Sequence, residues 1–275
     1  GKIMVEYFTS TAETLAAQID RSRELIEERG TPLQRAWLFN SLALLGLRRE
    51  RYRASEETVE QARKGWELLE QVEARQEVSD IGFIYAFSLL WADRLDEAES
   101  HLLEILAEAD RVGYATVQAR CVAYLALIGR KRGRVEEARR WAERTLAVAE
   151  TGGMAEYAAA AEAHLAWAAL REGRLDEAAP RARRAHAEGR TMGGAYRVLT
   201  WITAWPLLGV ELAEGNVDEA AGLARELLSP EAQPAPDPVA RALAEAVGAI
   251  EDSDPEGARE RLAEAARLAA SEGYL

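Results

Sequence analysis

The chain has 275 residues, of which 48% are apolar and 29% charged, and its formal net charge at pH 7 is −13. This charge argues against direct nucleic-acid binding, because nucleic-acid affinity depends on clustered Lys and Arg residues that displace counterions. No apolar run approaches the length of a membrane span, and the N-terminal residues lack the apolar core of a signal peptide. With Cys121 as the single cysteine, no disulfide can form within the chain, so we expect a cytoplasmic protein with Cys121 in its core.

Apolar residues recur at helical spacing along most of the chain, and β-branched runs that would favour strands are absent. Ser10 or Thr11 can cap a first helix that Gly30 ends, and Thr31-Pro32 opens the second. We expect the first helix to cover one end of the array. The helices after it are expected at residues 32–49, 54–73, 77–92, 95–112, 114–131, 134–151, 155–172, 175–189, 194–213, 216–228, 237–251 and 255–272.

One eight-residue pattern recurs at nearly constant spacing, with its fullest form at residues 171–178 (Arg-Glu-Gly-Arg-Leu-Asp-Glu-Ala). Gly ends one helix in the left-handed conformation, the acidic pair suits the first turn of the next helix, and the alanine lets two helices approach closely. The copies end at Ala98, Ala138, Ala178, Ala220 and Ala258, in steps of 40, 40, 42 and 38 residues. The pattern therefore predicts a corner between paired helices in a stacked array.

Two stretches interrupt this regularity. Pro206 lies inside an otherwise helical run and should kink or break the helix near Ile202. Residues 229–238 contain four prolines, too many for a helix, and are best interpreted as an extended connector that serves as a longer loop or as a hinge.

Aligned on the recurring pattern, the repeats resemble tetratricopeptide repeats over residues 32–273. Leu45-Gly46 matches the Leu-Gly of that family in a first helix, and the small residues Ala86, Ala126 and Ala166 fall at the same place in later repeats. The chain departs from the family in its period of about 40 rather than 34 residues, and in the Leu or Ala at most of its large aromatic positions.

Long, alanine-rich repeats of this kind are similar to the helical C-terminal region of bacterial signal-transduction ATPases linked to class III nucleotide cyclases or to LuxR/MalT-type regulators. Residues 205–220 and 265–275 look most like the cyclase-linked group. The resemblance implies a sensing or scaffolding module within a larger protein, with the ATPase and cyclase chemistry outside this chain.

The predicted fold is all-α, a right-handed superhelical solenoid of about six antiparallel helix pairs with an N-terminal capping helix. We expect a single domain over residues 1–275. It would comprise a cap at 1–30, regular repeats at 31–228, the Pro-rich connector at 229–238 and a terminal repeat at 239–275.

Motifs for catalysis, cofactors and metals are not found in the sequence. There is no Gly-rich loop ending in Gly-Lys-Ser/Thr and no Gly-x-Gly-x-x-Gly, so no nucleotide cofactor is expected. His101, His164 and His186 are widely separated, so no metal site is expected. The acidic pairs recur in several repeats, which a single active site would not do, and helix-start electrostatics explains them. The basic runs at 130–134 and 181–190 are interpreted as solvated helix faces with cations near helix C-termini.

A partner would contact the first helix of each pair, on the inner face of such an array. Counting in register from each corner, we expect an apolar wall that binds a protein, a peptide or a second copy of the chain. Arg120 and Arg130 are expected to select an acidic group on that partner. The same residues, spaced as on a helix, are also typical of core packing. The candidate partner-binding residues are Phe83, Phe87, Leu90, Leu127, Arg130, Trp167, Leu170, Trp201 and Trp205.

The leading functional hypothesis is a non-enzymatic interaction and regulatory module that binds protein and contacts neither nucleic acid nor membrane. The alternative is a sensor that binds a small metabolite in an apolar pocket among Phe83, Phe87, Tyr124 and Trp167. An enzyme on a helical-repeat scaffold is the third hypothesis. It would need a converging cluster of perturbed titratable groups, for which the sequence offers no candidate.

Overall fold

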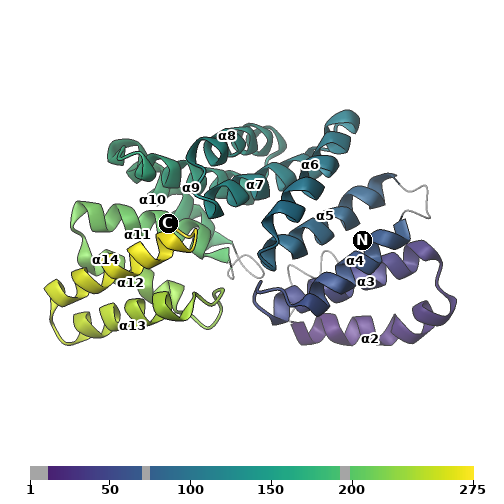
Figure 1. The fold of residues 1–275 in the computed structure, drawn as a ribbon, viewed down its shortest axis with the longest axis horizontal. Coiled ribbons are helices and arrows are strands. Elements are labelled where there is room, and N and C mark those ends of the chain that lie inside the picture. The colour runs from purple at the N-terminus through teal and green to yellow at the C-terminus, as the bar shows by residue number, and fades with distance from the viewer. Residues whose placement is uncertain (1–11, 70–74, 193–198) are drawn as a thin grey trace. The chain divides into compact units, whose positions relative to one another are not determined.

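The structure is a computed structural model that describes residues 12–69, 75–192 and 199–275; within these ranges it contains thirteen helices and no strand (Figure 1). The chain divides into two compact units. Unit 1 comprises residues 1–124 and 193–195, and unit 2 comprises residues 125–192 and 196–275. The predicted all-α repeat fold is confirmed, whereas the single domain expected over residues 1–275 stays a prediction.

Most helices begin and end within a few residues of the predicted bounds. Those up to the unit boundary are α2 (Ala12–Arg29), α3 (Pro32–Arg49), α4 (Glu56–Leu69), α5 (Arg75–Trp91), α6 (Leu95–Val112) and α7 (Ala115–Lys131), the last of which runs from unit 1 into unit 2. The rest are α8 (Val135–Gly152), α9 (Ala155–Arg171), α10 (Leu175–Thr191), α11 (Trp201–Glu214), α12 (Val217–Leu227), α13 (Asp237–Glu251) and α14 (Pro255–Ser271). In this part of the chain they form the expected first helix, α2, and six pairs.

Three predicted helix ends fall outside the described residues. The cap at Ser10 or Thr11, the last residues of the helix expected at 54–73, and the start of the helix expected at 194–213 lie there. The predicted start of α3 is confirmed. The Thr31 hydroxyl accepts a hydrogen bond from the Gln34 amide at 3.2 Å, and the Gln34 side chain accepts one from the Thr31 amide at 2.9 Å.

From α2 to α6 in unit 1 and from α8 to α14 in unit 2, helices that follow one another in the chain pack together. In unit 1, α3 also contacts α5; in unit 2, α9 contacts α11, and α12 contacts α14. The contacts α3–α5 and α9–α11 join the first helices of successive pairs, and the contact α12–α14 joins second helices. This is the neighbour-to-neighbour packing of a helical repeat array.

The predicted corners share one backbone geometry. At Gly133, Gly173 and Gly215 the φ angles are +67°, +73° and +84°, and the next residue's amide donates to a carbonyl five residues earlier, as in Arg134 to Gly129 at 2.8 Å. Asp93 and Ser253 occupy the glycine position in the two weaker copies of the pattern. Both have a φ of +61°, so the corner imposes the left-handed conformation even on residues with a Cβ.

The alanine that ends each copy of the pattern lies at a close approach between helices. Ala98, Ala138, Ala178, Ala220 and Ala258 are all fully buried. A Cβ placed on Gly129 of α7 would lie 2.9 Å from the Ala138 amide nitrogen of α8, so neither position has room for a larger residue. The small residues are thus required by the distance between the paired helices.

The described helix α11 begins at Trp201, one residue before the predicted kink or break near Ile202, and continues through Pro206 to Glu214; a kink near Ile202 stays a prediction. Since Pro206 has no N–H, the Ile202 carbonyl has no donor within the helix. Pro180 occupies the same place in α10, six residues into the helix, and leaves the carbonyl of Asp176 without a helical donor. Asp176 is exposed, whereas Ile202 is buried, so only the second carbonyl needs a donor from the protein.

The Pro-rich connector is a packed loop rather than a free hinge. Ala232 and Gln233, at its centre, are 2% and 7% exposed, and α13 begins at Asp237, as predicted. Cys121 is fully buried, in line with its expected place in the core. Across the described ranges, no helix is both long and apolar enough to cross a membrane.

Candidate functional site

The candidate partner-binding residues lie in the core rather than on an exposed wall. Eight of the nine are buried (Phe83, Phe87, Leu90, Leu127, Arg130, Trp167, Trp201 and Trp205), and Leu170 is partly buried. The expected exposure of these side chains is therefore wrong, and the competing interpretation of the stripe as core packing describes them better. Binding of a partner at this face stays a prediction.

In unit 1, Phe83 and Phe87 belong to a cluster of aromatic rings. Phe83 stacks on Phe87 with ring centroids 5.5 Å apart, and Phe87 contacts Tyr124 at 4.8 Å and Tyr52 at 5.6 Å. Trp91 closes the cluster against Phe87 at 5.7 Å. Phe83, Phe87 and Tyr124, which were expected to line a metabolite pocket, thus pack against one another.

Arg120 has a carboxylate partner within its own chain. Its Nη1 lies 3.3 Å from Oδ1 of Asp80, and its guanidinium carbon lies 5.6 Å from the centroid of the Phe83 ring. Both side chains of the ion pair are largely buried. The expectation that Arg120 selects an acidic group on a guest is not supported, because Asp80 already compensates its charge.

Arg130 is a fully buried cation in unit 2. Its Nη1 donates a hydrogen bond to the carbonyl oxygen of Ile202 at 2.8 Å, and its Nη2 donates one to the carbonyl oxygen of Tyr274. Burial lowers the pKa of Arg130 to about 9, so the guanidinium stays charged at neutral pH. No carboxylate in the described ranges forms an ion pair with it. The predicted solvated face at residues 130–134 is wrong for this residue, since α11 and residue 274 cover it.

Four of the candidate residues meet around the last residues of the sequence. The Tyr274 ring packs edge-on against the Trp201 ring, with centroids 4.7 Å apart. The guanidinium carbon of Arg130 lies over the Trp201 ring, 5.3 Å from its centroid. Leu275 packs with Trp167 in a cluster around Ala138 and Ala168. Leu170 and Leu275 also flank Gly209 of α11, where a Cβ would lie 3.2 and 3.3 Å from their methyl groups.

Several buried polar atoms of unit 2 have no hydrogen-bond partner within the described chain. They include Nε of Arg130, Nδ1 of His164 and Nε1 of Trp167. Burial, together with the positive charge of Arg130, holds the pKa of His164 well below its usual value, so His164 is neutral at physiological pH. Nε of Arg130 and Nε1 of Trp167, which can only donate, are thus buried in unit 2 without an acceptor among the described residues.

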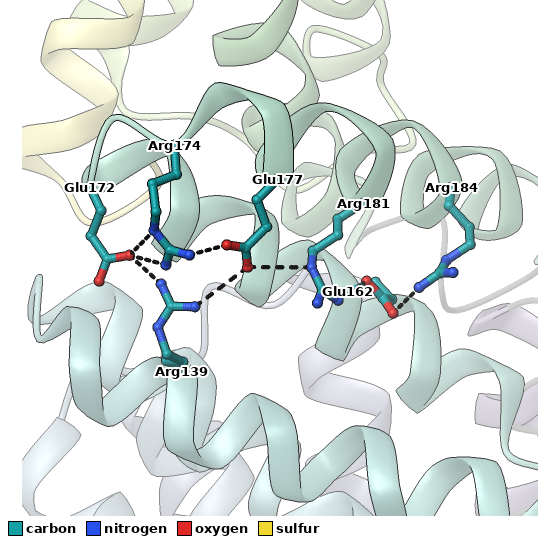
Figure 2. Close-up of polar contacts among 7 residues, drawn as sticks. All are labelled: Arg139, Glu162, Glu172, Arg174, Glu177, Arg181 and Arg184. Carbon is teal, nitrogen blue, oxygen red and sulfur yellow. Dashed lines mark hydrogen bonds and ion pairs between the residues drawn. The ribbon is translucent and has the colours of Figure 1, made fainter.

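A chain of ion pairs runs along α8, α9 and α10 (Figure 2), formed by Arg139, Glu172, Arg174, Glu177, Arg181, Glu162 and Arg184. Glu162 is its most buried member, with a side chain 3% exposed, and it accepts hydrogen bonds from Arg181 at 2.7 Å and from Arg184. The hydrogen bond from Arg174 lowers the pKa of Glu172. The second basic run is partly exposed, as expected, but it also neutralises a buried carboxylate.

No arrangement for metal chemistry occurs in the parts of the chain that the structure covers. No three His, Cys, Asp or Glu side chains there are placed to hold a metal ion. His186 lies 3.3 Å from the Thr203 hydroxyl and 3.2 Å from Oε2 of Glu226, which ties α10 to α11 and α12. Burial lowers the pKa of His186, and the charge of Glu226 partly opposes this shift.

No protein-family model and no curated protein matches the sequence. Solved structures do match. A Rap protein complexed with Competence and Sporulation Factor has a TM-score of 0.70 at 15% identity, over 98% of this chain and 74% of that chain. The apo form of RapI has a TM-score of 0.68 at 12% identity, over 97% of this chain and 95% of that chain. Aspartyl phosphate phosphatase F from Bacillus subtilis has a TM-score of 0.68 at 14% identity, over 97% and 68%.

This chain has the helical-repeat fold of the Rap proteins. At 12 to 15% identity the likeness extends to the fold alone, and it supports the tetratricopeptide-like architecture expected from the sequence. BtubC from P. vanneervenii is a further match, with a TM-score of 0.56 at 16% identity over 78% of this chain and 88% of that one.

Sequence reasoning did not single out two parts of this site. The sequence prediction places residues 273–275 at the end of the last repeat, although Gly273 after a helical run signals a chain reversal. Glu162 was not singled out either. A lone acidic residue in the alanine-rich stretch 158–169 is a detectable signal, since a charge on an apolar face requires a counter-charge.

Proposed function

We propose that the chain is a non-enzymatic regulatory module that binds a peptide or a segment of another protein through unit 2. The observation that carries this proposal is the meeting of Arg130, Trp167, Leu170 and Trp201 around residues 274–275. A buried guanidinium that binds a main-chain carbonyl, beside aromatic and aliphatic side chains, suits the backbone and side chains of a peptide.

The comparisons and the charge support the same proposal. A protein of this fold is described in complex with a factor, Competence and Sporulation Factor, and the likeness covers nearly all of the present chain. The net charge of −13 favours a protein partner over nucleic acid. A metabolite sensor has less support, since Phe83, Phe87 and Tyr124 pack against one another.

A peptide-display selection against the purified chain tests binding. We expect recovered peptides to bind saturably in calorimetry with micromolar or tighter Kd, and scrambled versions of the same peptides not to bind. A selection that yields no saturable binder would contradict the proposal. Substituting Trp167 or Trp205 by Ala is a poor test, because removing a buried ring costs about 3–5 kcal/mol of stability and would disturb the fold itself.

The proposal includes a place for the module. We infer that it is the repeat region of a larger bacterial signalling protein, in which a signal-transduction ATPase and a cyclase or LuxR-type output domain lie outside these residues. The open reading frame around the sequence tests this inference. An adjoining ATPase or output domain is expected, and a reading frame that encodes these residues alone would contradict it.

A further inference from the structure

Residues 273–275 make contacts that a repeat array does not require. In such an array each repeat packs against its neighbouring repeats. The carbonyl oxygen of Tyr274, however, accepts a hydrogen bond from Arg130, 144 residues earlier in the chain. The Tyr274 ring lies against Trp201, and Nζ of Lys131 lies over the Tyr274 ring, 5.9 Å from its centroid. The contacts join the residues after α14 to the end of α7 and the start of α11.

Gly273 fits this place because it has no side chain. Its φ is +74°, and a Cβ there would lie 2.5 Å from the carbonyl oxygen of Lys131 and 2.7 Å from the Lys131 Cα. Both are backbone atoms, which cannot turn away as a side chain can. The position before the aromatic residue therefore accepts Gly alone among the common amino acids.

Residues 274 and 275 are not fully enclosed. Both are only partly buried, although Arg130, Trp167 and Trp201 beneath them are buried. Nε of Arg130 and Nε1 of Trp167 have no acceptor among the described residues, and a buried donor without an acceptor destabilises the folded state. Another peptide that supplied an acceptor would bind the same side chains more tightly than these residues do.

We propose that unit 2 contains a binding site for an extended peptide of the sequence class Gly–aromatic–aliphatic, and that residues 273–275 occupy it as the chain's own competing ligand. Arg130 binds the main-chain carbonyl of the aromatic residue, and Trp201 contacts its ring. The aliphatic residue packs against the cluster that contains Trp167 and lies beside Gly209, which Leu170 also flanks. This inference rests on the proposed function and names the ligand chemistry of that same site.

The test uses the full chain with Gly273→Ala, which releases the competing segment, and a synthetic peptide of residues 269–275. We expect this variant to bind the peptide at least tenfold more tightly than the unaltered chain, where the tethered segment competes at a high effective concentration. Gly153→Ala is the matched control. Gly153 also ends a helix, with a φ of +65°, but a Cβ there would meet nothing within 4 Å, so binding should equal that of the unaltered chain.

The peptide itself carries a second control. With Ala in place of its Gly it should not bind any form of the chain, because the added Cβ meets the Lys131 backbone. If the Gly273→Ala chain keeps its helical circular dichroism and still does not bind the peptide, residues 273–275 are a fixed part of the core and the inference is wrong.

If Gly273→Ala does not fold, hydrogen exchange of the unaltered chain decides. The Tyr274 amide donates to the Ala269 carbonyl at 2.8 Å and reports whether this segment opens. Exchange through local opening, at a free energy below that of α9 and α11, supports the inference, and exchange only through global unfolding overturns it. Display-selected peptides that bind but lack Gly–aromatic–aliphatic sequences and do not compete with the peptide would overturn the inference while leaving the proposed function intact.

Discussion

The guanidinium of Arg130 donates a hydrogen bond to the carbonyl oxygen of Ile202, the one carbonyl that Pro206 deprives of its helical donor. The two residues lie in different helices and far apart in the sequence. A proline inside a buried helix leaves an unsatisfied acceptor, and a buried cation needs acceptors, so each residue compensates the cost of the other. This explains how α11 continues through Pro206 in the core of unit 2.

A double-mutant cycle should detect this compensation. Arg130→Met leaves the carbonyls of Ile202 and Tyr274 without this donor, and we expect it to lower the free energy of unfolding by about 2–3 kcal/mol. In a Pro206→Ala background the loss should be about 1 kcal/mol smaller, because the amide of residue 206 can then donate to Ile202. Urea unfolding of the four proteins measures the coupling.

Pro180→Ala provides the control for this cycle. It restores a helical donor in α10, but to the carbonyl of exposed Asp176. Its effect should therefore add to that of Arg130→Met without coupling. Equal coupling for both prolines would mean that the hydrogen bond to Ile202 is not what links Arg130 to Pro206.

Ser253→Gly should stabilise the protein. Ser253 has a φ of +61° at a corner where stronger copies of the pattern have Gly, and we expect a gain of about 0.5–1 kcal/mol from relieving this strain. The reverse change, Gly133→Ser, should cost a similar amount. A Cβ at Gly133 would meet nothing within 4 Å, so only its φ of +67° opposes the change. Shifts of the urea midpoint in the same direction for both variants would contradict the argument.

His164 should make the protein less stable at mildly acidic pH. The pKa of His164 in the folded state lies well below 6.5, its value in the unfolded chain. Between the folded-state pKa and pH 6.5, the unfolded chain therefore binds a proton that the folded chain does not. Stability is therefore fully present above pH 6.5 and falls as the pH drops, by at most about 1.4 kcal/mol per pH unit. His164→Gln should flatten the slope between pH 7 and 5 in urea unfolding. An unchanged slope would show that His164 titrates normally, and the slope that remains includes a contribution of the same sign from His186.

Glu162→Gln should destabilise unit 2 by about 1–3 kcal/mol. The substitution keeps the shape of the side chain but removes the charge that Arg181 and Arg184 neutralise in a buried position. Glu188→Gln, at an exposed position of α10, should change the free energy of unfolding by less than about 0.5 kcal/mol. Thermal unfolding of both variants measures the difference, and equal losses would count against a special role for Glu162.

Most helix bounds could be predicted from the sequence because their signals are local. Gly133 and Gly173 mark corners through the conformation of a single residue, and Ala138 and Ala178 mark close approaches through their size. The site was harder to predict. Register counting identified Arg130, Trp167 and Trp201 as a related set, but it placed them on an exposed face, since spacing along a helix does not show what covers that face.

The sequence by itself determined an all-α repeat array, the position of its corners and its acidic helix starts, because each depends on residues within one turn of one another. Only the tertiary structure decided that Arg130 is buried with no carboxylate partner among the described residues, that it compensates for Pro206, and that residues 274–275 lie on the candidate site. These facts depend on which distant backbone atoms meet a side chain. Contacts of that kind leave no periodic signal in the sequence.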